Sequence, residues 1–252
     1  MKYNNNNNNN YKVYGLNGSL SIMNSNSCVI DKIILSSDFQ IKKINNGDKL
    51  FSRYKDKTQI ISKDKFKNKY DTLRTQGIVI YFTYKIYNHL PDEIEDSSHQ
   101  CYIILDSIKD PQNLGQILRT SECAGADGVI IPERRSVNIT STVLQVSQGA
   151  FCNLNIIVSK NIKYLINELK ESDYWVIGIE NSIDSKNWYE IEMEGKVAFV
   201  FGSEGEGIRP LIRKYCDHMA TIPMVGIINS LNISATVSAI LFERNRQLLK
   251  SK

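Results

Sequence analysis

Two stretches near the carboxyl end of the chain decide the fold. They read Phe201-Gly-Ser-Glu-Gly-Glu-Gly-Ile-Arg-Pro210 and Ile222-Pro-Met-Val-Gly-Ile-Ile-Asn-Ser-Leu-Asn-Ile-Ser234. The glycines of the first allow a turn so tight that backbone groups can touch a ligand, and the second ends in a polar cluster at the start of an expected helix. Such loops, each after a strand, meet at the carboxyl ends of the strands in an α/β sheet. The two stretches therefore predict one binding site in an α/β domain.

Strand-like and helix-like segments alternate in the region that contains these stretches. The expected strands span residues 102–106, 128–131, 155–158, 174–179 and 197–201, and the expected helices span residues 113–124, 140–148, 162–171 and about 232–249. This alternation predicts a parallel sheet that is covered by helices on both faces. We assign residues 101–252 to this α/β domain.

A smaller α/β domain is expected over residues 11–88, with a helix over 13–23 and strands over 30–35 and 77–83. Residues 1–10 include an asparagine tract that cannot build a core, so they are predicted to be disordered. The tract has no signal-peptide pattern. Residues 89–100 are polar and acidic and contain a proline, so we interpret them as a linker.

The net charge of +4 conceals an asymmetry between the two parts of the chain. Residues 1–90 contain 15 Lys and Arg against 6 Asp and Glu, whereas residues 91–252 contain 16 against 21. A basic amino-terminal part indicates that this part meets a polyanion. A lysine-rich composition from an AT-rich genome would give the same excess, so charge alone does not decide.

Composition argues against several classes of protein. No run of eighteen apolar residues occurs, so no membrane span is expected. Five scattered cysteines without a C-x-x-C pair argue for a reducing intracellular compartment and against a disulfide framework or a zinc site; they are Cys28, Cys101, Cys123, Cys152 and Cys216. The compartment would be a mitochondrion or plastid in a eukaryote and the cytoplasm otherwise. Three ungrouped histidines make a metal enzyme unexpected.

Three motifs offer polar groups that have both a structural and a functional interpretation. In the first, Asn113 and Arg119 lie on an expected helix, and Arg119 either pairs with a carboxylate or grips a phosphate or carboxylate ligand. The second, residues 202–207, is neither a dinucleotide fingerprint nor a P-loop, and its glutamates favour a neutral or positively charged ligand. In the third, Ser230 or Asn232 either caps the next helix or faces a ligand.

In this order and spacing, the three motifs resemble those of the SpoU (TrmH-type) group of SPOUT RNA 2′-O-ribose methyltransferases. The motif N-x-G-x-x-x-R-[ST] is matched by residues 113–120, G-x-E-x-x-G by residues 202–207, and I-P-M-x-G…S-L-N-[VI]-S by residues 222–234. The similarity is greatest to enzymes that methylate a guanosine ribose in the peptidyl-transferase loop of large-subunit rRNA. It is highly specific over residues 101–249 and softer over residues 11–90.

The resemblance implies an α/β fold with a deep trefoil knot at the carboxyl end, an exception to the rule that chains stay unknotted. It implies an L30e-like RNA-binding domain over residues 11–88 and a homodimer whose active site combines both chains. It also implies large-subunit rRNA as the partner and S-adenosylmethionine as the methyl donor, without a metal. The implied cofactor-binding residues are Gly202, Ile222, Met224, Gly226 and Leu231.

The resemblance assigns the chemistry to Arg119, Asn113, Glu204, Ser230 and Asn232. A ribose 2′-hydroxyl is a weak acid, so it must lose its proton or be aligned very well before it attacks a methyl group. Family proposals give the arginine a base-like role, but the high pKa of a guanidinium group favours another hypothesis. In this hypothesis Arg119 binds the phosphate beside the target and stabilises the developing alkoxide, while the other four residues position the ribose and Arg119.

Three other functions share parts of this pattern. Methylation of tRNA would use the same motifs, although an L30e-like first domain favours rRNA. An inactive RNA-binding paralogue would have lost cofactor binding, and the intact motif residues argue against it. A Rossmann-type dehydrogenase fails on the order of the glycines and on the missing acidic residue after a first-strand fingerprint.

Overall fold

The computed structural model describes residues 10–91, 99–181, 185–203 and 205–250. The chain divides into two compact units, one made of residues 1–85 and 139–153 and the other of residues 86–138 and 154–252. Most of the predicted disordered tract, at residues 1–10, and of the predicted linker, at residues 89–100, lies outside the described residues.

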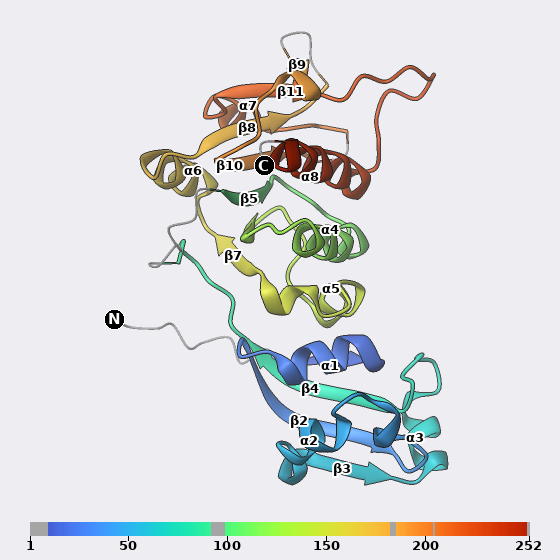
Figure 1. Cartoon of the computed structure of the whole chain (residues 1–252). Coiled ribbons are helices and arrows are strands. Elements are labelled where there is room, and N and C mark those ends of the chain that lie inside the picture. The colour runs from blue at the N-terminus through green and yellow to red at the C-terminus, as the bar shows by residue number, and fades with distance from the viewer. Residues whose placement is uncertain (1–9, 92–98, 182–184, 204, 251–252) are drawn as a thin grey trace. The chain divides into compact units, whose positions relative to one another are not determined.

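The larger unit is built on a sheet in the order β7-β6-β5-β10-β8-β11-β9, in which all neighbouring strands are parallel (Figure 1). Its strands are β5 (Gln100–Leu105), β6 (Gly128–Pro132), β7 (Asn155–Ser159), β8 (Trp175–Ile179), β9 (Lys186–Asn187), β10 (Lys196–Phe201) and β11 (His218–Thr221). The predicted parallel sheet is therefore confirmed. Residues 197–201 of β10 are fully buried, as the continuous apolar run in the sequence requires of a strand covered on both faces.

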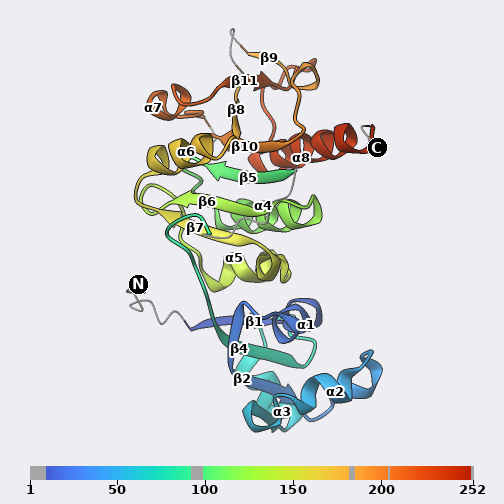
Figure 2. The same ribbon diagram turned by 60° about the vertical axis from the view of Figure 1, so that its left-hand side comes forward.

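Helices cover both faces of this sheet. They are α4 (Pro111–Cys123), α6 (Ile162–Glu171), α7 (Pro210–Arg213) and α8 (Ile233–Lys250), with the short 3₁₀ turn η4 (Trp188–Glu190). Figures 1 and 2 show α4 and α8 on one face and α6 and α7 on the other. None of the described helices has the length and apolar character needed to cross a membrane.

The chain does not place its strands in sequence order, because β10 lies between β5 and β8. After β11 the chain continues through residues 222–232 to α8, which packs against α4. Gln247 of α8 also accepts a hydrogen bond from the backbone N–H of Met193 at 2.8 Å and donates one to the carbonyl of Ile191 at 3.1 Å. The last helix is thus fixed to the segment that leads into β10. The trefoil knot itself stays a prediction.

The smaller unit has a four-stranded sheet in the order β1-β4-β2-β3. Its strands are β1 (Tyr11–Tyr14), β2 (Cys28–Ser36), β3 (Thr58–Ile61) and β4 (Ile78–Tyr84). Its helices are α1 (Leu16–Asn24), α2 (Gly47–Ser52), α3 (Lys63–Tyr70) and α5 (Ser141–Val146), with the 3₁₀ turns η1 (Ile41–Lys43), η2 (Lys55–Lys57) and η3 (Ala150–Asn153). The strands predicted at residues 30–35 and 77–83 correspond to β2 and β4.

The helix expected over residues 13–23 was wrong at its start. Residues Tyr11–Tyr14 instead form β1, which pairs antiparallel with β4. Gly15 then turns the chain with φ 85°, a left-handed conformation that glycine adopts without a steric cost, and the helix begins at Leu16. The turn residue, rather than the apolar periodicity, decides where the helix begins.

The helix α5 lies in the smaller unit, whereas the sequence-based boundaries placed all of residues 101–252 in one domain. The hydroxyl of Ser141 accepts a hydrogen bond from the backbone N–H of Lys12 at 2.9 Å. The amide of Gln145 accepts from the N–H of Tyr14 at 2.8 Å and donates to its carbonyl at 2.9 Å. Because β1 is an edge strand, its free backbone groups need such partners. This requirement explains why α5 accompanies β1.

Candidate active site

The three motifs begin at the carboxyl ends of β5, β10 and β11, which lie with β8 in four adjacent positions of the sheet, in the order β5, β10, β8 and β11. The residues that directly follow these strands are Asp106, Gly202, Glu180 and Ile222. Neighbouring strands lie about 4.8 Å apart, so these four positions span roughly 15 Å along one edge of the sheet. The structure therefore brings the first, second and third motifs to the same edge, as the sequence predicted.

Gly202 opens a tight hairpin in the second motif. Ser203 and Gly207 exchange two backbone hydrogen bonds of 3.1 Å, and Gly205 has a φ of 101°. A Cβ atom on Gly202 would lie 2.0 Å from the carbonyl carbon of Gly207, so only glycine fits there. The predicted catalytic residue Glu204 follows Ser203 in the sequence and lies outside the described residues.

We expect the substitution Gly202→Ala to lower the free energy of unfolding by about 1–3 kcal/mol, because the backbone of Gly207 must move to admit a methyl group. Urea denaturation followed by circular dichroism measures this change. Gly226→Ala is the matched control, since no atom lies within 4 Å of the added methyl group at that position. Equal midpoints for the two variants would contradict the steric explanation.

An ion pair between a buried carboxylate and a partly exposed arginine ties the second motif to the first. The carboxylate of Asp106 is completely buried and accepts the backbone N–H of Arg209 at 3.0 Å. Its other oxygen accepts Nε and Nη2 of Arg209 at 2.7 and 2.6 Å. The loop that follows β10 is thereby fixed to the end of β5. The sequence analysis missed this pair, and an acidic residue directly after a buried strand was the available signal.

Glu180 stabilises the same loop from the end of β8. Its Oε1 accepts a hydrogen bond from the backbone N–H of Ile208 at 3.1 Å, and its Oε2 lies 3.0 Å from Nη1 of Arg213. The carboxylate therefore closes the base of the Gly202 hairpin and holds Arg213, the last residue of α7. Glu180 was also missed, although it follows an apolar strand as Asp106 does.

Asn113 and Asn232 join the first and third motifs. Nδ2 of Asn232 donates to Oδ1 of Asn113 at 3.0 Å, and Asn113 is buried in the first turn of α4. The Oδ1 of Asn232 accepts the backbone N–H of Ser234 at 2.9 Å, so Asn232 also caps α8. The capping interpretation of Asn232 is confirmed, and two of the predicted site residues are in direct contact.

Further polar contacts continue from this pair along α4 and α8. The hydroxyl of Ser234 donates to Oε1 of Gln116 at 2.9 Å, and the hydroxyls of Thr120 and Ser238 lie 3.3 Å apart. Gln116 and Ser238 were not predicted as site residues. Their spacing of three or four residues from motif positions on the same helix is the signal that identifies them.

Arg119 lies on α4, one turn beyond Gln116, and its side chain is exposed. It forms no ion pair or hydrogen bond with any other residue that the structure describes. A structural salt bridge within the described part of the chain therefore does not explain Arg119. Its guanidinium group is available to an anionic ligand.

The third motif is an exposed segment rather than a packed loop. Ile222 and Met224 are half-buried, whereas Gly226, Ser230 and Leu231 are exposed. The side chains of Val225 and Ile227 are fully exposed. Ser230 forms no hydrogen bond with another described residue. The structure thus places these predicted residues at the expected edge of the sheet without joining them to the Asn113–Asn232 pair.

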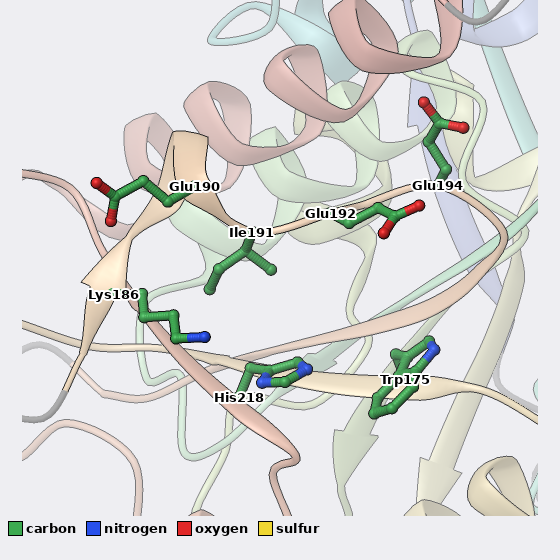
Figure 3. A pocket seen from close by; sticks show the side chains of 7 residues that line it. All are labelled: Trp175, Lys186, Glu190, Ile191, Glu192, Glu194 and His218. Atoms are coloured by element: carbon green, nitrogen blue, oxygen red, sulfur yellow. The ribbon is translucent and has the colours of Figure 1, made fainter.

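A separate cavity of about 250 Å³ contains none of the motif residues (Figure 3). Its lining consists of Trp175, Lys186, Glu190, Ile191, Glu192, Glu194 and His218. Trp175 and His218 are the first residues of β8 and β11, and their rings stack at 5.3 Å. The motif residues lie at the opposite ends of these strands, so the cavity is not part of the candidate active site.

Comparisons with known proteins agree with this geometry. The model of the SpoU rRNA Methylase family matches residues 100–242. A TrmH family tRNA/rRNA methyltransferase of Staphylococcus saprophyticus is 35% identical over 229 residues, which are 88% of this chain and 91% of the relative.

Two solved structures share the fold. One is the SpoU methyltransferase AviRb from Streptomyces viridochromogenes in complex with the cofactor AdoMet, with a TM-score of 0.81 and 18% identity over 97% of this chain and 95% of that one. The other is an RNA 2′-O ribose methyltransferase with a TM-score of 0.74 and 18% identity, covering 95% of this chain and 89% of that one. Both likenesses cover the two units of the chain.

Proposed function

Since the chain belongs to the SpoU rRNA Methylase family, we propose that it transfers a methyl group from S-adenosylmethionine to a ribose 2′-hydroxyl of RNA. We propose a guanosine of large-subunit rRNA as the target. The Asn113–Asn232 hydrogen bond carries this proposal, because it joins two of the three motifs beside Arg119, an exposed cation on the same helix.

The residues at the carboxyl edge of the sheet fit the cofactor that we propose. Residues 202–208 and 222–232 contain no lysine or arginine, so neither loop repels a sulfonium cation. The exposed apolar side chains of the third motif offer a surface to a purine ring. Backbone groups of Gly202, Ile222, Met224, Gly226 and Leu231 would hold the cofactor. When bound, S-adenosylmethionine supplies a methyl group with a neutral thioether as leaving group, and no metal is required.

Arg119 and the asparagine pair would act on the RNA. We propose that Arg119 binds the phosphate beside the target ribose and stabilises negative charge as the 2′-oxygen loses its proton. The contact with Asn232 fixes Asn113 on a helix, which lowers the cost of orienting the ribose. Ser230, and Glu204 from the second motif, complete the positioning set in this proposal.

Calorimetric titration with S-adenosylmethionine tests the cofactor assignment. A catalytically inactive RNA-binding paralogue would give no heat, whereas the proposed enzyme gives saturable binding. Transfer of labelled methyl groups to transcripts of large-subunit rRNA and of tRNA then distinguishes the proposed substrate from the alternative. Mapping of 2′-O-methyl sites in cells with and without the gene identifies the nucleotide.

We further propose that the smaller unit is an L30e-like domain that captures RNA. Phe66 and Tyr70 of α3 pack against Ile34 and Val79 of the sheet. The remaining positions of the helix carry four exposed lysines, which are Lys63, Lys65, Lys67 and Lys69. One amphipathic helix on a folded support thus presents two pairs of cations, Lys63 with Lys67 and Lys65 with Lys69, each pair four residues apart, and exposed cations of this kind can bind phosphates.

Replacement of Lys65, Lys67 and Lys69 by serine is expected to raise the KM for RNA at least about tenfold and to leave kcat unchanged. Loss of three phosphate contacts should reduce the slope of log affinity against log salt by about 2 for a single-stranded target. Fluorescence anisotropy over a salt series measures the slope. The control carries serine at Lys160, Lys163 and Lys214 of the larger unit, and an equal effect there would contradict a specific role of α3.

We also propose that the chain acts as a homodimer whose active site combines both copies. Large apolar side chains on α8 and on the segment before it are exposed, namely Val225, Ile227, Ile228, Phe242 and Leu249. Large exposed apolar patches mark interaction sites in proteins, and we propose that these side chains contribute to such a patch. Sedimentation equilibrium tests the proposal, and a monomer at micromolar concentration would contradict it.

A further inference from the structure

Two cysteines that are 124 residues apart in the sequence lie side by side in the smaller unit. Cys28 is the first residue of β2 and Cys152 lies in η3, and their sulfur atoms are 3.8 Å apart. Both are free thiols. This pair could not be predicted from the sequence, because its spacing matches no disulfide or metal-binding pattern.

Neighbouring contacts hold both backbones in place. The hydroxyl of Ser27 donates to the carbonyl of Cys152 at 2.9 Å, and the hydroxyl of Tyr84 donates to the carbonyl of Phe151 at 2.9 Å. The ring of Phe151 also contacts Tyr84 edge-on at 5.1 Å. A disulfide needs a sulfur–sulfur distance of about 2.05 Å, so the two sulfur atoms, which are 3.8 Å apart, must move closer together.

The two thiols differ in acidity and exposure. The hydrogen bond from Cys152 lowers the pKa of Cys28, with smaller contributions from Ser27 and Ser25, while the same bond raises the pKa of Cys152. Cys28 is half-buried and Cys152 is buried. Cys28 is therefore the sulfur that ionises and meets a reagent, and Cys152 is held as its proton donor.

The other three thiols provide a contrast within the same chain. Burial raises the pKa of both Cys101 and Cys216 to about 12, which makes these thiols inert at neutral pH. Cys123 is exposed, so its reaction with an oxidant shows the effect of solvent exposure alone.

We propose that Cys28 and Cys152 form a reversible disulfide, with a peroxide as oxidant and a dithiol as reductant. The Cys28 thiolate attacks one peroxide oxygen, so that an S–O bond forms, the O–O bond breaks and hydroxide leaves. The sulfur of Cys152 then attacks the sulfenic sulfur of Cys28. The S–S bond forms as the S–O bond breaks, and the departing oxygen leaves as water with the proton of Cys152.

The reverse reaction uses the same two sulfurs. A dithiol attacks the disulfide, forms a mixed disulfide and then closes on itself, which returns both cysteines to thiols. Such a cycle suits a reducing compartment, where disulfides are transient rather than structural. This inference concerns the smaller unit alone and stands whether or not the proposed methyl transfer is correct.

The disulfide would fasten the segment of residues 139–153 to β2. This segment supplies Ser141 and Gln145, which satisfy the backbone of β1. A bond across 124 residues also removes much freedom from the unfolded chain. Oxidation should therefore make the smaller unit harder to unfold.

The experiment treats the full-length, reduced protein with stoichiometric hydrogen peroxide at neutral pH. Remaining thiols are then alkylated, and peptides are analysed by mass spectrometry. We expect the linked peptides of Cys28 and Cys152 to be the main product and to vanish after treatment with dithiothreitol. In the Cys152→Ser variant, dimedone should label Cys28. The Cys123→Ser variant should form the same link as the natural chain.

A second measurement compares the natural chain with itself in its oxidised and reduced states. The urea midpoint of the oxidised natural chain should exceed that of the same sample after reduction, and Cys28→Ser should remove the difference. Oxidation of Cys123 before the pair, with Cys28 and Cys152 still open to alkylation, would overturn the proposal. Equal midpoints for the oxidised and reduced chains would overturn the fastening of residues 139–153.

Discussion

Replacement of Arg119 by alanine is expected to lower the rate of methyl transfer to RNA by about 10²–10³-fold, the usual cost of losing one group that stabilises developing negative charge. Stability should not change, because the exposed side chain has no partner among the described residues. Affinity for S-adenosylmethionine should also be retained, since the proposed cofactor residues lie on other loops. Single-turnover methylation and calorimetry measure the two effects separately.

The Arg119→Lys variant tests whether the reaction needs the planar guanidinium group or only its positive charge. A lysine keeps the charge but loses the planar set of donors, so a role in binding phosphate and stabilising the alkoxide predicts a large loss of rate in this variant too. Lys214→Ala removes an exposed cation near the amino end of β11 and serves as the control for net charge. Near-normal turnover of Arg119→Lys on cognate RNA would contradict the proposed role.

The second large effect concerns the ion pair between the buried carboxylate of Asp106 and Arg209. Arg209→Met should reduce the free energy of unfolding by about 3–5 kcal/mol, because it leaves the completely buried carboxylate of Asp106 without its cation. Asp106→Asn should cost less, about 1–3 kcal/mol, since an amide oxygen can still accept the backbone N–H of Arg209. Urea unfolding at neutral pH measures both changes.

The double variant separates the ion pair from the packing around it. Asp106→Asn combined with Arg209→Met removes both charges, so its stability should lie close to that of Asp106→Asn alone. Additive losses in the double variant would show that the two side chains act independently. The two single substitutions differ in expected cost because the Arg209 side chain reaches solvent while that of Asp106 does not.

The sheet of the larger unit could be predicted because its strands are buried on both faces. Continuous apolar runs such as residues 197–201, separated by helical patterns, leave a parallel sheet as the simplest arrangement. The helix at residues 162–171 was predicted with the bounds that the structure shows. In the smaller unit, strands β1 and β3 are short and their residues mixed, so periodicity gave no clear signal for them.

The candidate site was predictable where local sequence carried it. Asn113 and Asn232 were selected from motifs, and the structure brings their side chains to 3.0 Å. The hydrogen-bonding partners of Asp106 and Glu180 could not be predicted from local sequence. Each of these carboxylates binds a residue that approaches only after β10 is inserted between β5 and β8, so the pairing depends on strand order.

The discontinuous smaller unit has a consequence for synthesis of the protein. During synthesis, β1 to β4 leave the ribosome first. Ser141 and Gln145, which accept hydrogen bonds from backbone N–H groups of β1, follow only with residues 139–153. Until then the nascent strand exposes open amide groups, a template for pairing with other chains. A fragment ended at residue 100 would keep that edge bare permanently and would be prone to aggregate.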